Sequence, residues 1–202
     1  MMRRRAAIDV SELPNYAFGH RSLVWWGTNA FIITEATVFV LAIASDLYLR
    51  QHAPHWPPAT YAPPGLLWGT LNTVIMLASC LPNQLYKTAA EREDVRGVRI
   101  WLTVAFLFAL AFLAVRVLEF TTLNIRWDSN AYGSIVWWLM GLHTLHVATD
   151  VADTAVLLAI ILVRRPRGRR FVDVSENGFY WYFVVLSWIP IYVVIYLVPR
   201  RS

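Results

Sequence analysis

The chain has 202 residues, of which 57% are hydrophobic and only 15% are charged, and it carries 10 Trp. An average soluble domain is about 25% charged, so this composition excludes an ordinary soluble domain and indicates an integral membrane protein. A net charge of +5 could indicate a protein that binds nucleic acid, but the basic residues cluster at the ends of apolar runs and not on one amphipathic face. We therefore expect these residues to lie near anionic membrane lipids, and we expect no nucleic acid partner.

The cysteine content limits which disulfides and metal sites the chain can form. Cys80 is the single cysteine and lies in an apolar run. A disulfide within the chain, a cysteine-based zinc site and a two-cysteine copper centre are therefore excluded.

Five apolar segments follow a polar arm over residues 1–22, which we expect to lie in the cytoplasm. Each is long enough for a helix that crosses the ~30 Å hydrocarbon layer. Residues 23–202 therefore predict one all-α domain, an integral membrane bundle of five transmembrane helices at about 23–49, 65–86, 100–121, 132–163 and 178–198.

Two of these segments and one connection have special features. Residues 50–64, RQHAPHWPPATYAPP, contain five prolines, which forbid a helix and predict an irregular external connection. The segment over 132–163 would span about 48 Å at 1.5 Å per residue, so it must tilt or protrude. Pro190 predicts a kink in the last helix.

The basic residues predict an orientation. Of the 18 Lys and Arg, 13 lie in the N-terminal arm and in the loops around 87–99 and 164–170, whereas 4 lie on the opposite side. Since positively charged loops stay in the cytoplasm, we expect the N-terminus inside and the C-terminus outside.

The fourth segment carries a polar stripe, GLHTLHVATDVAD. At ~100° per residue, His143, His146, Asp150 and Asp153 fall within a sector of about 80° of a helix. Such residues are costly in hydrocarbon and should face protein, water or each other. The stripe allows three interpretations, which are a metal or haem site, a proton relay and a packing seam.

Three more ionisable residues lie at membrane depth. Counted along the helices at 1.5 Å per residue, Glu35 should lie at the level of Asp153, Arg116 near His146, and Glu119 higher still. Glu35 either carries protons or bonds a backbone or hydroxyl group. Arg116 and Glu119, at i and i+3, predict a structural ion pair, because a voltage sensor would need a repeated arginine ladder.

The H-x-x-H spacing of His143 and His146 permits two imidazoles on one metal, but the pattern is common, and hydrogen bonds to neighbouring helices are the simpler expectation. We predict no catalytic residue and no metal ligand. Trp25 and Trp26 mark the interface at the start of the first helix, and the other Trp and Tyr residues are typical of an interfacial belt.

Three stretches in the same order resemble subunit III of the haem-copper terminal oxidases, cytochrome c oxidase in particular. They are WWGTNAFIITEATVFVLAIASDLYLR, GLHTLHV and GFYWYFVVLSWIPIYVVIYLV, and the resemblance covers about Trp25 to the C-terminus. It is closest to the short five-helix bacterial form, which lacks the family's first two helices. This form implies a bacterial inner membrane, with the N-terminus cytoplasmic and the C-terminus periplasmic.

The resemblance implies a subunit without a redox centre of its own. Such a subunit packs against catalytic subunit I and subunit II, where haem and copper are expected, binds phospholipid, stabilises the core and supports proton uptake in aerobic respiration. Glu35 falls on the family's buried glutamate, and His143 and His146 on its structural H-x-x-H-V pair. Trp181 falls in a Y-W-H-F phrase and, with Tyr182, is expected at a lipid or subunit interface.

Two departures from the family pattern leave alternatives open. Tyr182 replaces the phrase's histidine, and Asp150 stands where the family usually has a small residue. This divergence also fits the related subunit of a nitric oxide reductase-like complex. A protein of another class, a free-standing b-haem or metal-binding membrane protein, would use His143 and His146.

Overall fold

The structure is a computed structural model that describes residues 16–164 and 166–200, and these residues contain no strand. Most of the N-terminal arm, with its three consecutive arginines, and Arg165 lie outside the described residues. The bundle consists of α1 (Leu23–His52), α2 (Leu66–Glu91), α3 (Val95–Thr121), α4 (Ala131–Val163) and α5 (Arg169–Tyr192), and α5 continues as a π-helix, Val193–Leu197, and a 3-10 turn, Val198–Arg200. In the described part of the chain, five helices are long and apolar enough to cross a membrane, as predicted.

Polar side chains fix where three of the helices begin. The Ser22 hydroxyl accepts a hydrogen bond from the Val24 amide at 3.2 Å, Asp94 accepts one from the Arg96 amide at 3.0 Å, and Asn130 caps α4. These caps satisfy amides that have no partner inside the helix. The Pro-rich connection after His52 is irregular, as its prolines predict.

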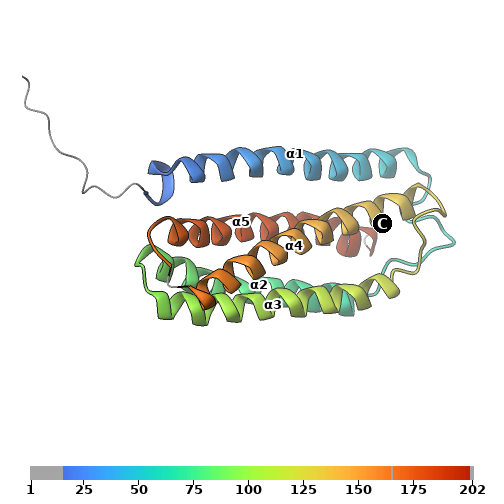
Figure 1. Ribbon diagram of the computed structural model, residues 1–202. Helices are drawn as coiled ribbons and strands as arrows, with labels where there is room; N and C mark the ends of the chain where they lie inside the picture. The colour runs from blue at the N-terminus through green and yellow to red at the C-terminus, as the bar shows by residue number, and fades with distance from the viewer. Residues whose placement is uncertain (1–15, 165, 201–202) are drawn as a thin grey trace, which may run out of the picture.

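The helices run along a common direction, with α2 and α3 adjacent and α1 on the opposite side of the bundle (Figure 1). One core cluster centres on Leu139, Phe112 and Trp188, and a second lies at the end of the bundle near the turn between α2 and α3. Helix α1 contacts α4 and α5 and is the least buried of the five. It is therefore attached to the bundle through few buried side chains.

Three helices extend well beyond the apolar segments. Helix α3 begins at Val95, five residues before the predicted start. Helix α5 begins at Arg169, nine residues before the predicted start, because Phe171, Val172 and Val174 are buried although Asp173 stands among them. Hydropathy detects only the membrane-spanning part of such a helix. Helix α2 continues to Glu91 for the same reason, since Tyr86, Ala89 and Ala90 are buried.

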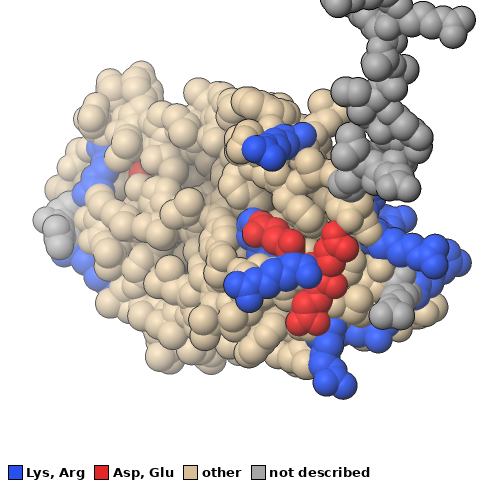
Figure 2. Space-filling view, turned by 90° about the vertical axis from the view of Figure 1, so that its left-hand side faces the viewer, with Lys and Arg blue, Asp and Glu red and all other residues tan. Residues whose placement is uncertain are grey.

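Charged side chains gather at the end of the bundle that Figure 2 faces, where α1 begins and where the α2–α3 and α4–α5 connections lie. The Tyr16 hydroxyl donates to Glu93 there at 2.6 Å, and this hydrogen bond raises the pKa of Tyr16 above its ordinary value. We call this end the basic end, after the arginines of residues 164–170. Which side of the membrane it occupies stays a prediction from the charge count.

A glycine permits the closest approach between α2 and the end of α5. A Cβ atom built on Gly69 would lie only 2.6–2.9 Å from three ring atoms of Tyr196. Tyr196 is fully buried, so its ring has little room to move. Gly141, on α4, has no atom within 4 Å of its Cβ position.

We therefore predict that Gly69→Ala destabilises the protein, whereas Gly141→Ala does not. Overpacking at a buried site costs typically about 1–3 kcal/mol in the free energy of unfolding. Thermal unfolding in detergent micelles measures both variants side by side. Equal melting temperatures for the two would show that Tyr196 does not pack as described.

Candidate functional site

The most deeply buried charges form an ion pair on α3. Arg116 Nη1 lies 2.8 Å from Glu119 Oε2, and both side chains are 1% exposed. Asn72 donates to the same carboxylate at 2.6 Å, and the Tyr196 hydroxyl donates to its other oxygen. One carboxylate therefore joins α2, α3 and the end of α5.

Aromatic rings enclose the arginine. Its guanidinium carbon lies 4.1 Å from the centre of the Trp188 ring and 4.7 Å from that of Phe112. Such cation–π contacts stabilise a cation that has left water. The pair expected from the i, i+3 spacing is thus present and fully inside the bundle.

His143 packs in the same aromatic group. Its ring centre lies 5.0 Å from that of Trp188, and Nε2 lies 3.0 Å from the Val184 carbonyl of α5. A carbonyl only accepts, so Nε2 carries a hydrogen and links α4 to α5. The ring is fully buried.

His146 lies in a different environment, against α1. Its Nε2 is 3.4 Å from Glu35 Oε1, and the Tyr180 hydroxyl donates to Glu35 Oε2 at 2.6 Å. The Phe39 ring covers His146 at 4.8 Å between ring centres. Glu35 therefore links α1 to both α4 and α5, in addition to the hydrogen bond from Arg50 of α1 to the Val198 carbonyl at 3.3 Å.

The hydrogen bonds fix the number of protons that this contact needs. His146 Nδ1 lies 2.7 Å from the Leu142 carbonyl, so Nδ1 carries a hydrogen. In a neutral ring Nε2 is then an acceptor, and it faces Glu35 Oε1, an acceptor when the carboxyl is ionised. The contact is favourable only when one proton resides on the pair, either on His146 Nε2 or on Glu35.

The two aspartates of the stripe meet α5 at Asn177. Its Nδ2 lies 3.4 Å from Asp150 Oδ1, 3.4 Å from Asp153 Oδ2 and 3.1 Å from the Thr154 hydroxyl. The Tyr86 hydroxyl of α2 donates to the Asn177 carbonyl oxygen at 3.0 Å. The acids thus do not contact Glu35 directly, and the two groups form neighbouring sites.

Glu35 lies further along α4 than the helix counting places it. Its partner is His146, whereas counting at 1.5 Å per residue puts Glu35 level with Asp153. Helix α4 crosses the bundle obliquely (Figure 1), which accounts for part of this difference.

The aromatic residues predicted at an interface divide into two kinds. Trp26 is 59% exposed and donates to the His20 carbonyl, and the rings of Trp25 and Trp26 are perpendicular to each other. Trp181 is buried instead and donates to the Ser79 hydroxyl at 2.8 Å, which places it between α2 and α5 within this chain. Tyr182 faces outward and donates to Gln84.

Several residues of these sites had no sequence signal of their own. Tyr180 counts as an interfacial tyrosine by composition, and Asn177 and Glu176 stand just before the apolar run that marks the last helix. Asp46, 3% exposed, is a further buried acid, on α1. Helical spacing does place Glu176, Asn177 and Tyr180 on one side of α5, four residues or fewer apart.

The comparison with protein families covers nearly the whole chain. The family model described as Cytochrome c oxidase subunit III matches residues 11–199. The chain belongs to the cytochrome c oxidase subunit III family. The resemblance carried by the three stretches is thereby confirmed, and the chain is a haem-copper oxidase subunit III.

Individual members of the cytochrome c oxidase subunit III family are similar over almost the same length. The "Cytochrome c oxidase subunit 3" of Thermostichus vulcanus is 28% identical over 189 residues, 92% of each chain. The "Probable cytochrome c oxidase subunit 3" of Mycobacterium tuberculosis (strain ATCC 25618 / H37Rv) is 30% identical over 196 residues, 91% of this chain and 92% of the relative. A subunit III is part of a complex with other oxidase subunits, and the five apolar helices make this one a multi-pass membrane protein.

We predict that Arg116→Met destabilises this subunit III strongly. Removing one member of a buried pair leaves the other charge without compensation, which costs about 3–5 kcal/mol in the free energy of unfolding. Denaturant unfolding in micelles measures the loss, and adding Glu119→Gln to the same chain should recover part of it.

Arg126→Met is the matched control, because Arg126 pairs with Asp128 at the surface and its side chain is 76% exposed. The hydrogen bond from Arg126 lowers the pKa of Asp128, yet solvent screens this pair. If Arg116→Met unfolded like Arg126→Met, the buried network would not hold the bundle together.

Proposed function

We propose that this subunit packs against catalytic subunit I and subunit II of the oxidase, stabilises them and supports proton uptake, with no redox centre of its own. The observation that carries the proton role is the Glu35–His146–Tyr180 contact. It needs one proton that can reside on either of two side chains, and it lies at membrane depth. Such groups in membrane helices are typical of proton relays.

The surroundings of the histidines support placing haem and copper in the partner subunits. A haem iron needs a free imidazole nitrogen with open space in front of it. His143 Nε2 faces the Val184 carbonyl, and its ring packs against Trp188 and Phe112. His146 Nε2 faces Glu35, so the described residues do not fit a haem between the two histidines.

The exposed face of α1 supports association with another subunit. Gly27 has open space at its Cβ position, and the Thr34 and Thr37 hydroxyls bond to carbonyls of their own helix. Small and internally satisfied polar residues let helix backbones approach closely in a membrane. We also propose that phospholipid binds at the surface of the bundle. The proposed location is a bacterial inner membrane, in accord with the bacterial relatives.

Purification under mild detergent tests the assignment. We expect the chain to copurify with haem-copper subunits, and the chain separated from them to show no haem Soret band. A Soret band stoichiometric with the separated chain would instead support a free-standing b-haem protein.

The proton role predicts that Glu35→Gln slows proton uptake by the assembled oxidase or shortens its active lifetime, while the haem and copper content stays the same. Tyr180→Phe should act in the same direction, because it removes the hydrogen bond to Glu35. Asp128→Asn, in the exposed loop before α4, is the control. Unchanged proton kinetics and lifetime in Glu35→Gln would leave the contact purely structural.

A further inference from the structure

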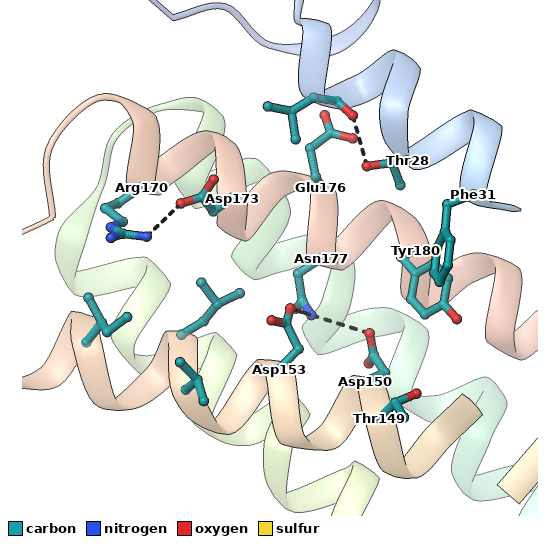
Figure 3. Close-up of a pocket in the computed structure, with 14 residues that line it drawn as sticks. Thr28, Phe31, Thr149, Asp150, Asp153, Arg170, Asp173, Glu176, Asn177 and Tyr180 are labelled. Atoms are coloured by element: carbon teal, nitrogen blue, oxygen red, sulfur yellow. Dashed lines mark hydrogen bonds and ion pairs between the residues drawn. The ribbon is translucent and has the colours of Figure 1, made fainter. Parts of the chain in front are cut away.

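A cavity of about 530 Å³ lies between α1, α4 and α5 (Figure 3). It begins at the basic end, beside Val24 and Arg170, and extends inward to Thr149 and Tyr180. The ten residues from Arg170 to Tyr180 correspond to roughly 15 Å along α5, whose apolar part begins at Gly178, and the fourteen from Thr149 to Val163 to roughly 21 Å along α4. The cavity therefore runs from the basic end of the bundle to the beginning of the apolar part of α5.

The lining of the cavity is strongly acidic. It includes the carboxyl groups of Asp150, Asp153, Asp173 and Glu176, which we call the cavity acids. Among the described residues that line the cavity, Arg170 is the sole Lys or Arg, and it already pairs with Asp173 at 3.1 Å. The other three cavity acids have no cation partner in the lining.

Hydrogen bonds from the protein do not satisfy these acids. Asn177 Nδ2 has two hydrogens, yet three acceptors lie around it, and the distances to Asp150 and Asp153 are both 3.4 Å. In Figure 3 the Asn177 amide points between the two carboxyl groups. At most one good hydrogen bond per aspartate is available, and both bonds are long.

Glu176 independently indicates that a hydrogen-bond donor from outside the chain is needed in the cavity. The residue is 6% exposed, and its Oε2 has no hydrogen-bond partner among the residues that the structure describes. The Thr28 hydroxyl lies within hydrogen-bonding reach of the carboxyl group, but its hydrogen is donated to the Val24 carbonyl at 3.1 Å. Lys87 of α2 acts on the carboxyl group electrostatically, but its ammonium is paired with Glu91. A buried carboxyl oxygen without a donor is costly, so a donor is expected on the cavity side.

The end of the cavity that lies farthest from the basic end is next to Glu35. Tyr180 lines the cavity with its ring and donates its hydroxyl hydrogen to Glu35 at 2.6 Å. Asp150, across the cavity from Tyr180, lies one turn along α4 from His146. A proton or water molecule in the cavity is therefore separated from Glu35 by one side chain.

We propose that this cavity is an aqueous vestibule that admits water and small cations from the basic end of the bundle to Tyr180 and Glu35. Water donates the hydrogen bonds that Glu176, Asp150 and Asp153 lack, cations balance their charge, and the acids repel anions. Lipid chains would fill the same space against Phe31, Val156 and Ile160, but they would leave Glu176 Oε2 without a donor and the two aspartates with one long hydrogen bond each. That the vestibule supplies protons to the oxidase rests on the proposed function, whereas its water content and its charge preference do not.

Cysteine accessibility tests the vestibule in membranes that contain the full complex. In a Cys80→Ser background, Thr149→Cys places a thiol on the cavity wall and leaves all four cavity acids in place. Ala152→Cys is the matched control, because Ala152 is exposed, lies on the same helix three residues away and does not line the cavity. Three thiol reagents are compared: a cationic methanethiosulfonate, an anionic methanethiosulfonate and the membrane-permeant N-ethylmaleimide.

We expect the cationic reagent, added from the side of the basic end, to modify Thr149→Cys at least about tenfold faster than the anionic one. Asp150→Asn with Asp153→Asn should reduce this preference, and Ala152→Cys should react slowly with all three reagents, because a thiol in an apolar surrounding stays protonated. Reaction of Thr149→Cys as slow as that of Ala152→Cys with all three reagents would show a lipid-filled groove and overturn the proposal, as would equal rates for the two charged reagents. Because the readout is independent of turnover and of copurification, its failure is distinct from failure of the proposed function.

Discussion

The buried ion pair between Arg116 and Glu119 is the contact on which the rest of the bundle depends. An isolated charge cannot remain in the low-dielectric interior, so the guanidinium and the carboxylate determine which groups must surround them. Asn72 comes from α2, Tyr196 from the end of α5, and the Trp188 and Phe112 rings cover the cation. Four helices of the chain are held in register in this way, since His143 of α4 packs against the same rings.

Helix α1 is attached in another manner, and the difference bears on function. Its contact with the bundle is centred on Glu35, which meets His146 of α4 and Tyr180 of α5. Between this contact and the basic end, α1, α4 and α5 line the acidic cavity. Because α1 makes few apolar contacts, polar and ionisable side chains can lie between it and the other two helices. The chain thus combines a rigid core around Arg116 with a looser, polar region around Glu35.

Much of the fold follows from the sequence. The five apolar segments, the Pro-rich connection and the Arg116–Glu119 pair can all be predicted, because each depends on local composition or spacing. The early start of α5 at Arg169 cannot, because its burial depends on how α2 and α5 pack. Depth counting also misses the contact between Glu35 and His146, because counting along each helix takes no account of how the helices pack.

The site was only partly predictable for related reasons. Intramembrane acids and histidines are rare, so Glu35, His146, Asp150 and Asp153 are conspicuous in the sequence. Tyr180 and Asn177 are ordinary residues in a chain with many aromatic and polar side chains, and only the packing of α5 shows that they connect those groups. The acid at position 150, which we expect to be unusual for the family, is part of the cavity wall, as is Tyr180.

The central claim is that the Glu35 site exchanges protons while the oxidase works. Infrared difference spectroscopy of the complex during turnover tests it most directly, with Glu35→Gln used to assign the signal. The account predicts a carboxyl band that changes between oxidase states in the native complex and is lost in the variant. A spectrum in which no changing carboxyl band depends on Glu35 would contradict it.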